Sequence, residues 1–276
     1  MKKEIRQIIK KDGQKIVQIT TYDERWYARE VKDKKTGLPE YKFYPSVTWI
    51  TSYYPKGIGF MKWLASKGWD EAELAKEEGG KKGYKVHLAA SALLQGQKVA
   101  MTDAFPPEFG AEPEELKPDE YECLMNLVDW VNSMENFEVI ASEYTAFNEK
   151  DNYAGTIDLI CRIDGQLWLV DFKISSHVWP SHEIQLAAYA HLDVELEGLG
   201  ISEKEWKEKK LAILQLGYNR NQKGWKFTEV SEQYDLFLAI YKIWEKECAG
   251  VEPSQKDYPL ELEIKKLARK NAKSKR

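Results

Sequence analysis

The residues most able to do chemistry lie on two apolar, alternating segments in the middle of the chain. Asp158 lies on the first segment, and Asp171 and Lys173 lie on the second. The dipeptide Asp164-Gly165 between them favours a two-residue hairpin turn. Such a turn predicts that Asp158 faces Asp171 across two antiparallel strands. It also predicts that Thr156 faces Lys173.

Two carboxylates opposed on one sheet face repel each other, so a cation is expected between them. A divalent metal with oxygen ligands fits this need, and the Phe172 carbonyl would add a further ligand. The chemistry indicated is metal-assisted hydrolysis of a phosphodiester. Lys173 would then orient the attacking water or stabilise charge in the transition state. A reading without metal is an Asp171–Lys173 ion pair, with Asp158 accepting hydrogen bonds.

These residues carry a family resemblance. The combination of GTID, DFK and QLAAY resembles the PD-(D/E)xK nuclease superfamily, in its RecB-like exonuclease branch. Gly83–His87 is similar to the Gly-x-x-x-His segment of that branch. The segment PSVTWI at residues 45–50 is similar to one in the mitochondrial genome maintenance exonuclease and its phage and bacterial relatives.

The resemblance implies an α/β fold with a restriction-endonuclease-like core, a mixed β-sheet flanked by helices, and an N-terminal β-hairpin and helical extension. It implies hydrolysis of DNA with Mg²⁺ or Mn²⁺, by an exonuclease acting on single-stranded or linear DNA. The metal ligands that it implies are His87, Glu143, Asp158, Asp171 and the Phe172 carbonyl. The catalytic residues that it implies are Asp158, Asp171, Lys173, Gln185 and Tyr189.

Some of these residues have plainer interpretations. His87 taken alone would more often be a core histidine, and Glu143 a solvated strand residue. Gln185 and Tyr189 share one helix face and could be polar groups at the edge of the core. Alternative functions are a sequence-specific endonuclease of the same fold, a catalytically silent DNA-binding recombination accessory protein, and a protein–protein adaptor.

The composition limits the class of protein. The three cysteines form no CxxC pair, so neither a zinc site, a disulfide framework nor a four-cysteine iron–sulfur cluster is expected. No segment has the apolar length of a membrane span, and residues 1–15 lack the features of a signal peptide. We therefore expect a cytoplasmic protein, in a bacterial or phage-infected cell, with no membrane partner.

The charge is unevenly distributed. The formal charge is −4, but seven Lys and Arg follow Glu263, so residues 1–263 carry −11. An acidic chain binds DNA only through a local basic patch or this tail, because Lys and Arg neutralise the phosphates. The residues expected to track phosphates are Lys81, Lys82 and Lys85. The acidic surface also suits a protein partner or homo-oligomer.

The alternation and helical periodicity predict the order of elements. Predicted strands cover residues 15–31, 41–50, 137–147, 153–163, 166–173, 211–219 and 225–230. Predicted helices cover residues 57–97 with a break at Gly79-Gly80, then 119–134, 181–196 and 231–247. The expected divisions are an N-terminal β extension (1–56), a helical segment (57–135), a nuclease core (136–247) and a basic tail (248–276), in one compact domain. An aromatic run, favoured as core rather than as a base-stacking surface, comprises Trp49, Tyr53, Tyr54, Phe60, Trp63 and Trp69.

Overall fold

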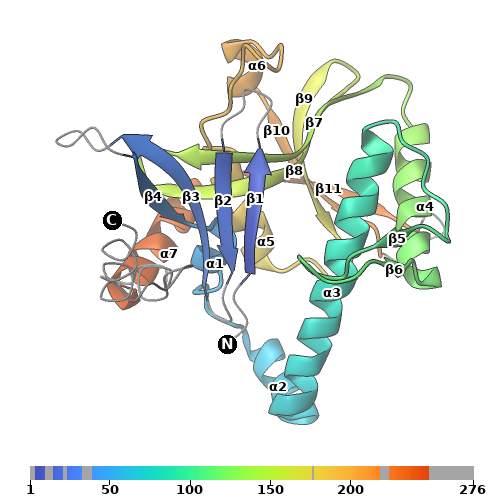
Figure 1. Ribbon diagram of the computed structural model, residues 1–276, viewed down its shortest axis with the longest axis horizontal. Coiled ribbons are helices and arrows are strands. Elements are labelled where there is room, and N and C mark those ends of the chain that lie inside the picture. Colours follow the sequence, from blue (N-terminus) through green and yellow to red (C-terminus); the bar gives the residue numbers. More distant parts are fainter. Residues whose placement is uncertain are drawn as a thin grey trace, which may run out of the picture.

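The computed structural model of the protein describes residues 4–9, 15–20, 24–32, 39–175, 177–217 and 224–248. At its centre is a five-stranded sheet (Figure 1). Its strands are β7 (Phe137–Asn148), β8 (Tyr153–Ile163), β9 (Gln166–Lys173), β10 (Lys210–Gln215) and β11 (Lys226–Val230). The order is β11–β10–β9–β8–β7, and all neighbours are antiparallel except β9 and β10. The prediction of a mixed sheet is confirmed.

Helices cover both faces of this sheet, as predicted. They are α1 (Val47–Thr51), α2 (Ile58–Lys67), α3 (Trp69–Leu94), α4 (Pro118–Asn132), α5 (Pro180–Tyr189), α6 (Glu203–Lys207) and α7 (Tyr234–Glu247). On one face, α3 and α4 bury residues such as Val86 and Leu127 against the strands. On the other face, α1, α5 and α7 contribute residues such as Ile184 and Phe237 to a second core.

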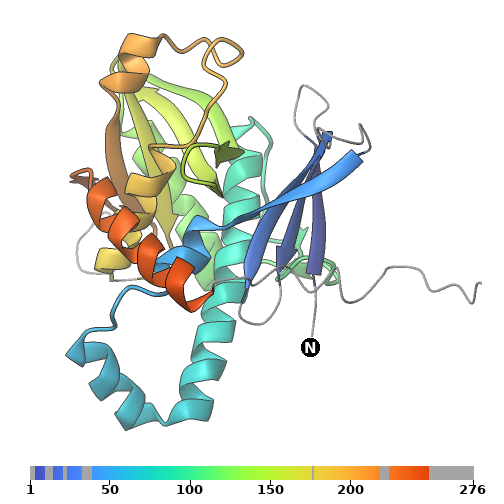
Figure 2. The same cartoon turned by 90° about the vertical axis from the view of Figure 1, so that its left-hand side faces the viewer.

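The N-terminal part of the chain forms a second, antiparallel sheet in the order β1–β2–β3–β4. Its strands are β1 (Glu4–Ile9), β2 (Lys15–Thr20), β3 (Arg25–Lys32) and β4 (Pro39–Pro45). Figure 2 shows α3 next to this sheet, and the two sheets pack directly on each other through a small core of Ile16, Tyr27, Tyr44, Phe147 and Ala154. Glu149 joins the two sheets, because its carboxylate accepts a hydrogen bond from Tyr44 Oη (2.8 Å) and pairs with Arg29 (2.7 Å). The short strands β5 (Ala104–Phe105) and β6 (Glu114–Glu115) lie between α3 and α4 in sequence.

The β8–β9 hairpin forms at the predicted turn. Asp164 and Gly165 both have positive φ, 49° and 82°, as a type I′ turn requires. The predicted register is confirmed from this turn as far as the pair Leu159–Val170. The ladder ends there, so the predicted pairs Asp158–Asp171 and Thr156–Lys173 are wrong as ladder pairs.

A side chain explains why the ladder ends. The Phe172 amide donates to Oδ2 of Asp158 at 2.7 Å, and thus makes a hydrogen bond to a carboxylate instead of the facing strand. Leu159 packs in the core under α3 and α4, whereas Ile157 packs in the core under α5 and α7. The strand therefore turns over at Asp158, and β8 and β9 separate at the residues that could do chemistry.

Residues 47–50, predicted as the end of a strand, lie in helix α1 instead. Ser46 is the N-cap, and its side-chain oxygen accepts a hydrogen bond from the Trp49 amide at 3.1 Å. This cap satisfies one of the free amides of the first turn. It outweighs the strand preference of the β-branched and aromatic residues that follow.

Helix α3 continues through Gly79 and Gly80, where a break was predicted. A glycine inside a helix costs about 1 kcal/mol relative to alanine. Packing of the following turns offsets this cost, because Val86 and Ala89 are fully buried. The long helix carries one rigid face from the tip of the α2–α3 hairpin to the sheet.

The remaining differences concern boundaries. The predicted strand 15–31 is the pair β2 and β3, and β1 was not predicted. Helix α5 begins at Pro180 and ends at Tyr189, before the predicted end at residue 196. The predicted basic tail lies outside the described residues, apart from Cys248.

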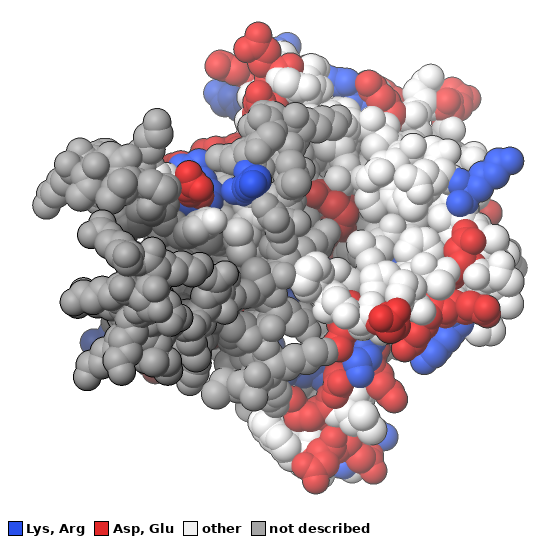
Figure 3. Space-filling model, in the orientation of Figure 1, with Lys and Arg blue, Asp and Glu red and all other residues white. Residues whose placement is uncertain are grey.

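Charges of both signs are mixed on the described surface. On the face shown in Figure 3, Lys and Arg are scattered among Asp and Glu. The described part of this face therefore offers no broad basic surface for phosphate groups.

Within the described ranges, no helix has the length and apolar character needed to cross a membrane.

Candidate metal centre

The centre begins with one face of α3. Residues three or four apart on a helix share a face, so Gly80, Tyr84, His87 and Ser91 lie along one side. The first three of these residues line a cavity of about 300 Å³. Ser91 lies beyond it, where its Oγ is 3.0 Å from the Ser142 Oγ on β7. The face of α3 that carries His87 is thus held against the end of the sheet.

A buried ion pair fixes the other side of α3. Lys85, which is 1% exposed, places its Nζ 2.8 Å from Oε2 of Glu120 on α4. The same ammonium donates to the Glu115 carbonyl at 2.8 Å. Because Lys85 and His87 project from opposite sides of the helix, this pair sets the rotation of α3 that points His87 into the cavity.

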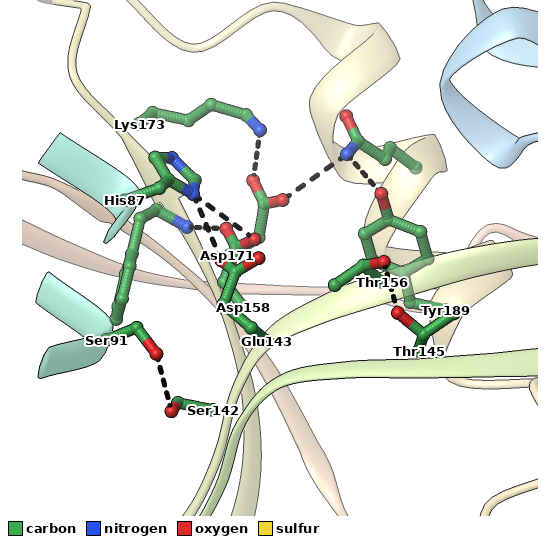
Figure 4. Close-up of polar contacts among 12 residues, drawn as sticks. His87, Ser91, Ser142, Glu143, Thr145, Thr156, Asp158, Asp171, Lys173 and Tyr189 are labelled. Carbon is green, nitrogen blue, oxygen red and sulfur yellow. Dashed lines mark hydrogen bonds and ion pairs between the residues drawn. The ribbon is translucent and has the colours of Figure 1, made fainter. Parts of the chain in front are cut away.

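Three possible ligand atoms converge in the cavity (Figure 4). His87 Nδ1 lies 3.5 Å from Asp158 Oδ1 and 3.7 Å from Glu143 Oε1. One donor atom from each residue lies within 4.8 Å of the other two. The three residues come from α3, β8 and β7, so the site depends on the packing of the helix on the sheet.

Glu143 reaches the cavity through a strained backbone. Its φ is +51°, in the left-handed region that residues other than Gly, Asn and Asp rarely adopt. The β7–β8 ladder pairs Ser142 with Leu159 and Tyr144 with Ile157, and Glu143 and Asp158 lie unpaired between them. Left-handed φ costs roughly 1–2 kcal/mol, and such strain gathers at functional sites.

The strain at Glu143 can be measured with two substitutions that both remove the carboxylate. Only Glu143→Gly also removes the Cβ that opposes positive φ. We expect Glu143→Gly to be more stable than Glu143→Gln by roughly 0.5–1 kcal/mol, which is the relieved strain less the entropy that glycine loses on folding. Urea unfolding in the presence of a chelator measures the difference. Equal stability of the two variants would show that the position is unstrained.

Asp171 lies beside this cluster and is only 1% exposed. Lys173 Nζ lies 2.5 Å from its Oδ2, and Gln185 Nε2 lies 3.5 Å from its Oδ1. Gln185 also donates to Tyr189 Oη at 2.7 Å, so the pair on α5 supports the carboxylate. Tyr189 lies against Gly155, where an added Cβ would be 2.4 Å from the ring. Glycine is therefore required at this position.

The charges of the cluster depend on one another. Burial opposes a charged His87, but the Asp158 and Glu143 carboxylates outweigh it and raise the pKa of His87 to about 10. Burial alone would raise the pKa of Asp158, yet the His87 imidazolium and the Lys173 ammonium lower it. Burial raises the pKa of Asp171 against the pull of Lys173, and the Asp158 carboxylate adds to the rise. Without a metal, the positive charges of His87 and Lys173 thus balance the negative charges of the carboxylates.

No protein family matches the chain, and no curated protein matches its sequence. The site has therefore to be interpreted from its own residues and geometry.

The structure brings the residues selected from the sequence to one place. The cavity is lined by His87, Glu143, Asp158, Asp171, Lys173, Gln185 and Tyr189. The Phe172 side chain points away from the cavity into the core, and its ring centre lies 6.0 Å from that of His87. The individual roles of these residues stay predictions.

The predicted phosphate-tracking lysines do not form one patch. Lys85 is buried against Glu120, so the expectation for it is wrong. Lys82 points toward α4, where it pairs with Asp119 at 2.5 Å. Lys81 lines a cavity of about 230 Å³. Lys81 and Lys82 are successive on α3 and therefore point in different directions, whereas Lys85 is held inward by Glu120 and the Glu115 carbonyl.

The aromatic run is divided in the same way. Trp49 is buried, and Tyr53 and Tyr54 pack against the same core, as favoured from the sequence. Trp63 and Trp69 are 38% and 66% exposed on the α2–α3 hairpin. Core packing therefore accounts for only part of the run.

Sequence reasoning missed the contribution of the N-terminal sheet. Tyr27 Oη lies 3.0 Å from Thr156 Oγ1, which lies 2.8 Å from Thr145 Oγ1. Gln18 Nε2 donates to the same tyrosine oxygen at 2.9 Å. Tyr27 and Gln18 also line the cavity. Their only signal in the sequence was strand alternation, which does not reveal that β2 and β3 fold over the site.

The donor set fits a divalent cation. Carboxylates and imidazole are ligands for Mn²⁺, Fe²⁺ and Zn²⁺, and carboxylates are ligands for Mg²⁺. Oδ2 of Asp171 is buried and pairs with the Lys173 ammonium, and it is a fourth carboxylate oxygen in the same cavity as the triad. The contacts expected without a metal are also present, namely the Asp171–Lys173 ion pair and the hydrogen bond from the Phe172 amide to Asp158. The interpretation without metal does not explain why the strained backbone of Glu143 places a third carboxylate in the cavity with Asp158 and Asp171.

Proposed function

We propose that the protein is a divalent-metal-dependent deoxyribonuclease with a restriction-endonuclease-like core of the PD-(D/E)xK type. The observation that carries the proposal is the convergence of His87, Glu143 and Asp158 beside the Asp171–Lys173 pair in one cavity. A buried group of three acids and two bases is costly for folding alone. Such groups of perturbed titratable residues are typical of catalytic sites.

Each residue has a task in phosphodiester hydrolysis. His87, Glu143 and Asp158 would hold a Mg²⁺ or Mn²⁺ ion, which would act as a Lewis acid on the phosphate and make the attacking water more acidic. The Lys173 ammonium donates to a phosphate oxygen and stabilises the negative charge that grows in the transition state. Asp171 keeps this ammonium in place at 2.5 Å. Gln185 orients Asp171, and its own amide is held by Tyr189.

We infer exonuclease action on single-stranded or linear DNA from the resemblance to RecB-like exonucleases. This inference rests on analogy with a family, because the same core also occurs with other specificities. A covalently closed circle distinguishes the possibilities. An exonuclease degrades the linear strand and leaves the circle intact, whereas discrete fragments from the circle would indicate an endonuclease.

The metal requirement is tested with Asp158→Asn. The amide oxygen can still accept the hydrogen bond from Phe172, but a charged ligand is lost. Removing even an outer partner of a metal ligand typically costs 10–100-fold. We therefore expect at least a roughly 100-fold loss of DNA cleavage in Mg²⁺ or Mn²⁺, measured on labelled linear DNA.

Asp129→Asn, at an exposed position of α4, is the matched control and should cleave like the wild type. Excess chelator should stop cleavage by the wild-type protein, and added Mn²⁺ should restore it. Cleavage that survives chelation or the Asp158 substitution would refute the proposed function. DNA binding without any cleavage in Mn²⁺ would instead identify a catalytically silent accessory protein.

A further inference from the structure

The cavity at the metal centre continues into a second cavity of about 230 Å³. The two are lined in common by Gln18, Arg25, Gly80 and Tyr84. One wall is made by β2 and β3, and the other by α3. We call this continuous depression the sheet–helix groove, defined by those four residues together with Lys81 and Phe109. It leads from the metal centre toward Phe109, between the two elements that Figure 2 shows next to each other.

The groove combines cationic and aromatic side chains. Arg25 lines both cavities, and Lys81 lines the outer one. Tyr84 lies at the junction, and Phe109, which is 37% exposed, lies in the outer part. Proteins that bind single-stranded nucleic acid combine these two features: a positive groove for the backbone and aromatic rings on which bases stack.

The side of the groove formed by α3 carries two glycines, which have no side chains to fill it. Gly80 and Gly83 line the inner cavity, and a Cβ built on either would meet nothing within 4 Å. Packing therefore does not require glycine at these two positions. Their absent side chains leave room for a ligand to approach the helix next to Tyr84.

Arg25 is the cation best placed to bind a phosphate. The outer cavity also carries Glu77 and Glu108, and Glu77 pairs with Lys81 at 2.7 Å. The charge of Lys81 is thus partly neutralised. No carboxylate in the described part of the chain forms an ion pair with Arg25, which lies at the start of β3 beside the metal centre.

We propose that the sheet–helix groove binds single-stranded DNA next to the scissile phosphate, with Arg25 on a backbone phosphate and Tyr84 stacked on a base. This proposal rests on the proposed nuclease function and specifies its substrate. Stacking on Tyr84 requires an exposed base face, which a single strand offers and a continuous duplex does not. The strand then passes between the N-terminal sheet and α3 and reaches the metal centre at His87.

Binding is measured without cleavage by replacing Mg²⁺ with Ca²⁺ and following the anisotropy of a short fluorescent single strand. Arg25→Ala should weaken binding and lower the slope of log affinity against log salt by about 0.7, the share of one phosphate contact on a single strand. Arg25→Lys should restore that slope. Tyr84→Leu should weaken binding roughly 5- to 150-fold and leave the slope unchanged, as loss of one stacked base predicts.

The control is Lys204→Ala on α6, an exposed lysine outside the groove, which should bind like the wild type. Thermal unfolding of every variant shows that the fold is retained, and Arg25→Gln, which also removes the charge but keeps a longer side chain, takes the place of Arg25→Ala if that variant is unstable. If the wild type cleaves DNA but Arg25→Ala and Tyr84→Leu bind it as tightly as the wild type, the proposed role of the groove is wrong and the proposed nuclease function is unaffected. Preference for a blunt duplex over the single strand would overturn it as well. Wild type that neither binds nor cleaves DNA would refute the proposed function instead.

Discussion

Replacing Lys173 by methionine should reduce the kcat of DNA cleavage by roughly 100- to 1,000-fold, the scale of removing one preorganised electrostatic group. Methionine keeps most of the apolar stem and removes the ammonium that lies 2.5 Å from Asp171. Asp171 then remains buried without its cation. The pKa of Asp171, already raised by burial, rises further. The carboxyl group is then neutral, so no unpaired buried charge destabilises the fold.

The readouts for Lys173→Met separate catalysis from binding and folding. Single-turnover cleavage in Mg²⁺ reports the chemical step, and anisotropy in Ca²⁺ reports DNA binding, which should change little. Lys204→Met provides the matched loss of one exposed lysine. Undiminished cleavage by Lys173→Met would exclude Lys173 from the reaction and would favour the purely structural ion pair with Asp171.

The largest effect on stability is expected at the buried pair between α3 and α4. The Lys85 and Glu120 side chains are 2% and 3% exposed, and their charges are 2.8 Å apart. Lys85→Met leaves the Glu120 carboxylate buried without a counter-charge. Breaking a buried pair in this way typically costs 3–5 kcal/mol. We expect a loss of about that size in the free energy of unfolding, measured by urea denaturation.

The double variant Lys85→Met/Glu120→Leu is the decisive companion. Replacing both charges by apolar side chains of similar size is often neutral or stabilising, so most of the lost stability should return. A remainder of about 2 kcal/mol is expected, because the Glu115 carbonyl loses its donor and the Lys117 amide loses its acceptor. A double variant as unstable as the single one would show that the ion pair is not the source of the loss.

The hairpin could be predicted because its information is local. Asp164-Gly165 specifies the turn, and the turn fixes the register of the strands on either side. The apolar runs of the helices likewise predicted which segments cover the sheet. The position of Asp171 and Lys173 at the end of a buried strand followed from the same pattern.

The details of the site depended on contacts that local patterns do not contain. The β8–β9 ladder ends because the Asp158 side chain captures the Phe172 amide, a choice between two acceptors of similar chemistry. The positive φ of Glu143 arises from the way β7 pairs with β8, and nothing in its neighbours marks it. Ser46 was a visible capping residue, but the strand-forming residues after it hid the short helix.

Contacts between distant segments were the hardest to foresee. Lys85 was expected on the surface, and its burial depends on Glu120, 35 positions later on another helix. Tyr27 and Arg25 reach the cavity because the N-terminal sheet folds over it, and alternation within a strand does not show which partner its face meets. The sequence thus indicated the residues that are candidates for catalysis, but not the residues that form the walls of the groove.

The central claim is that His87, Glu143 and Asp158 hold a catalytic metal. Diffraction from crystals soaked in Mn²⁺, recorded where manganese scatters anomalously, tests it most directly. We predict an anomalous peak within bonding distance of the His87 nitrogen and of both carboxylates, with weaker occupancy in Asp158→Asn. A cavity without a peak at saturating Mn²⁺, with His87 still paired to the two acids, would contradict the account.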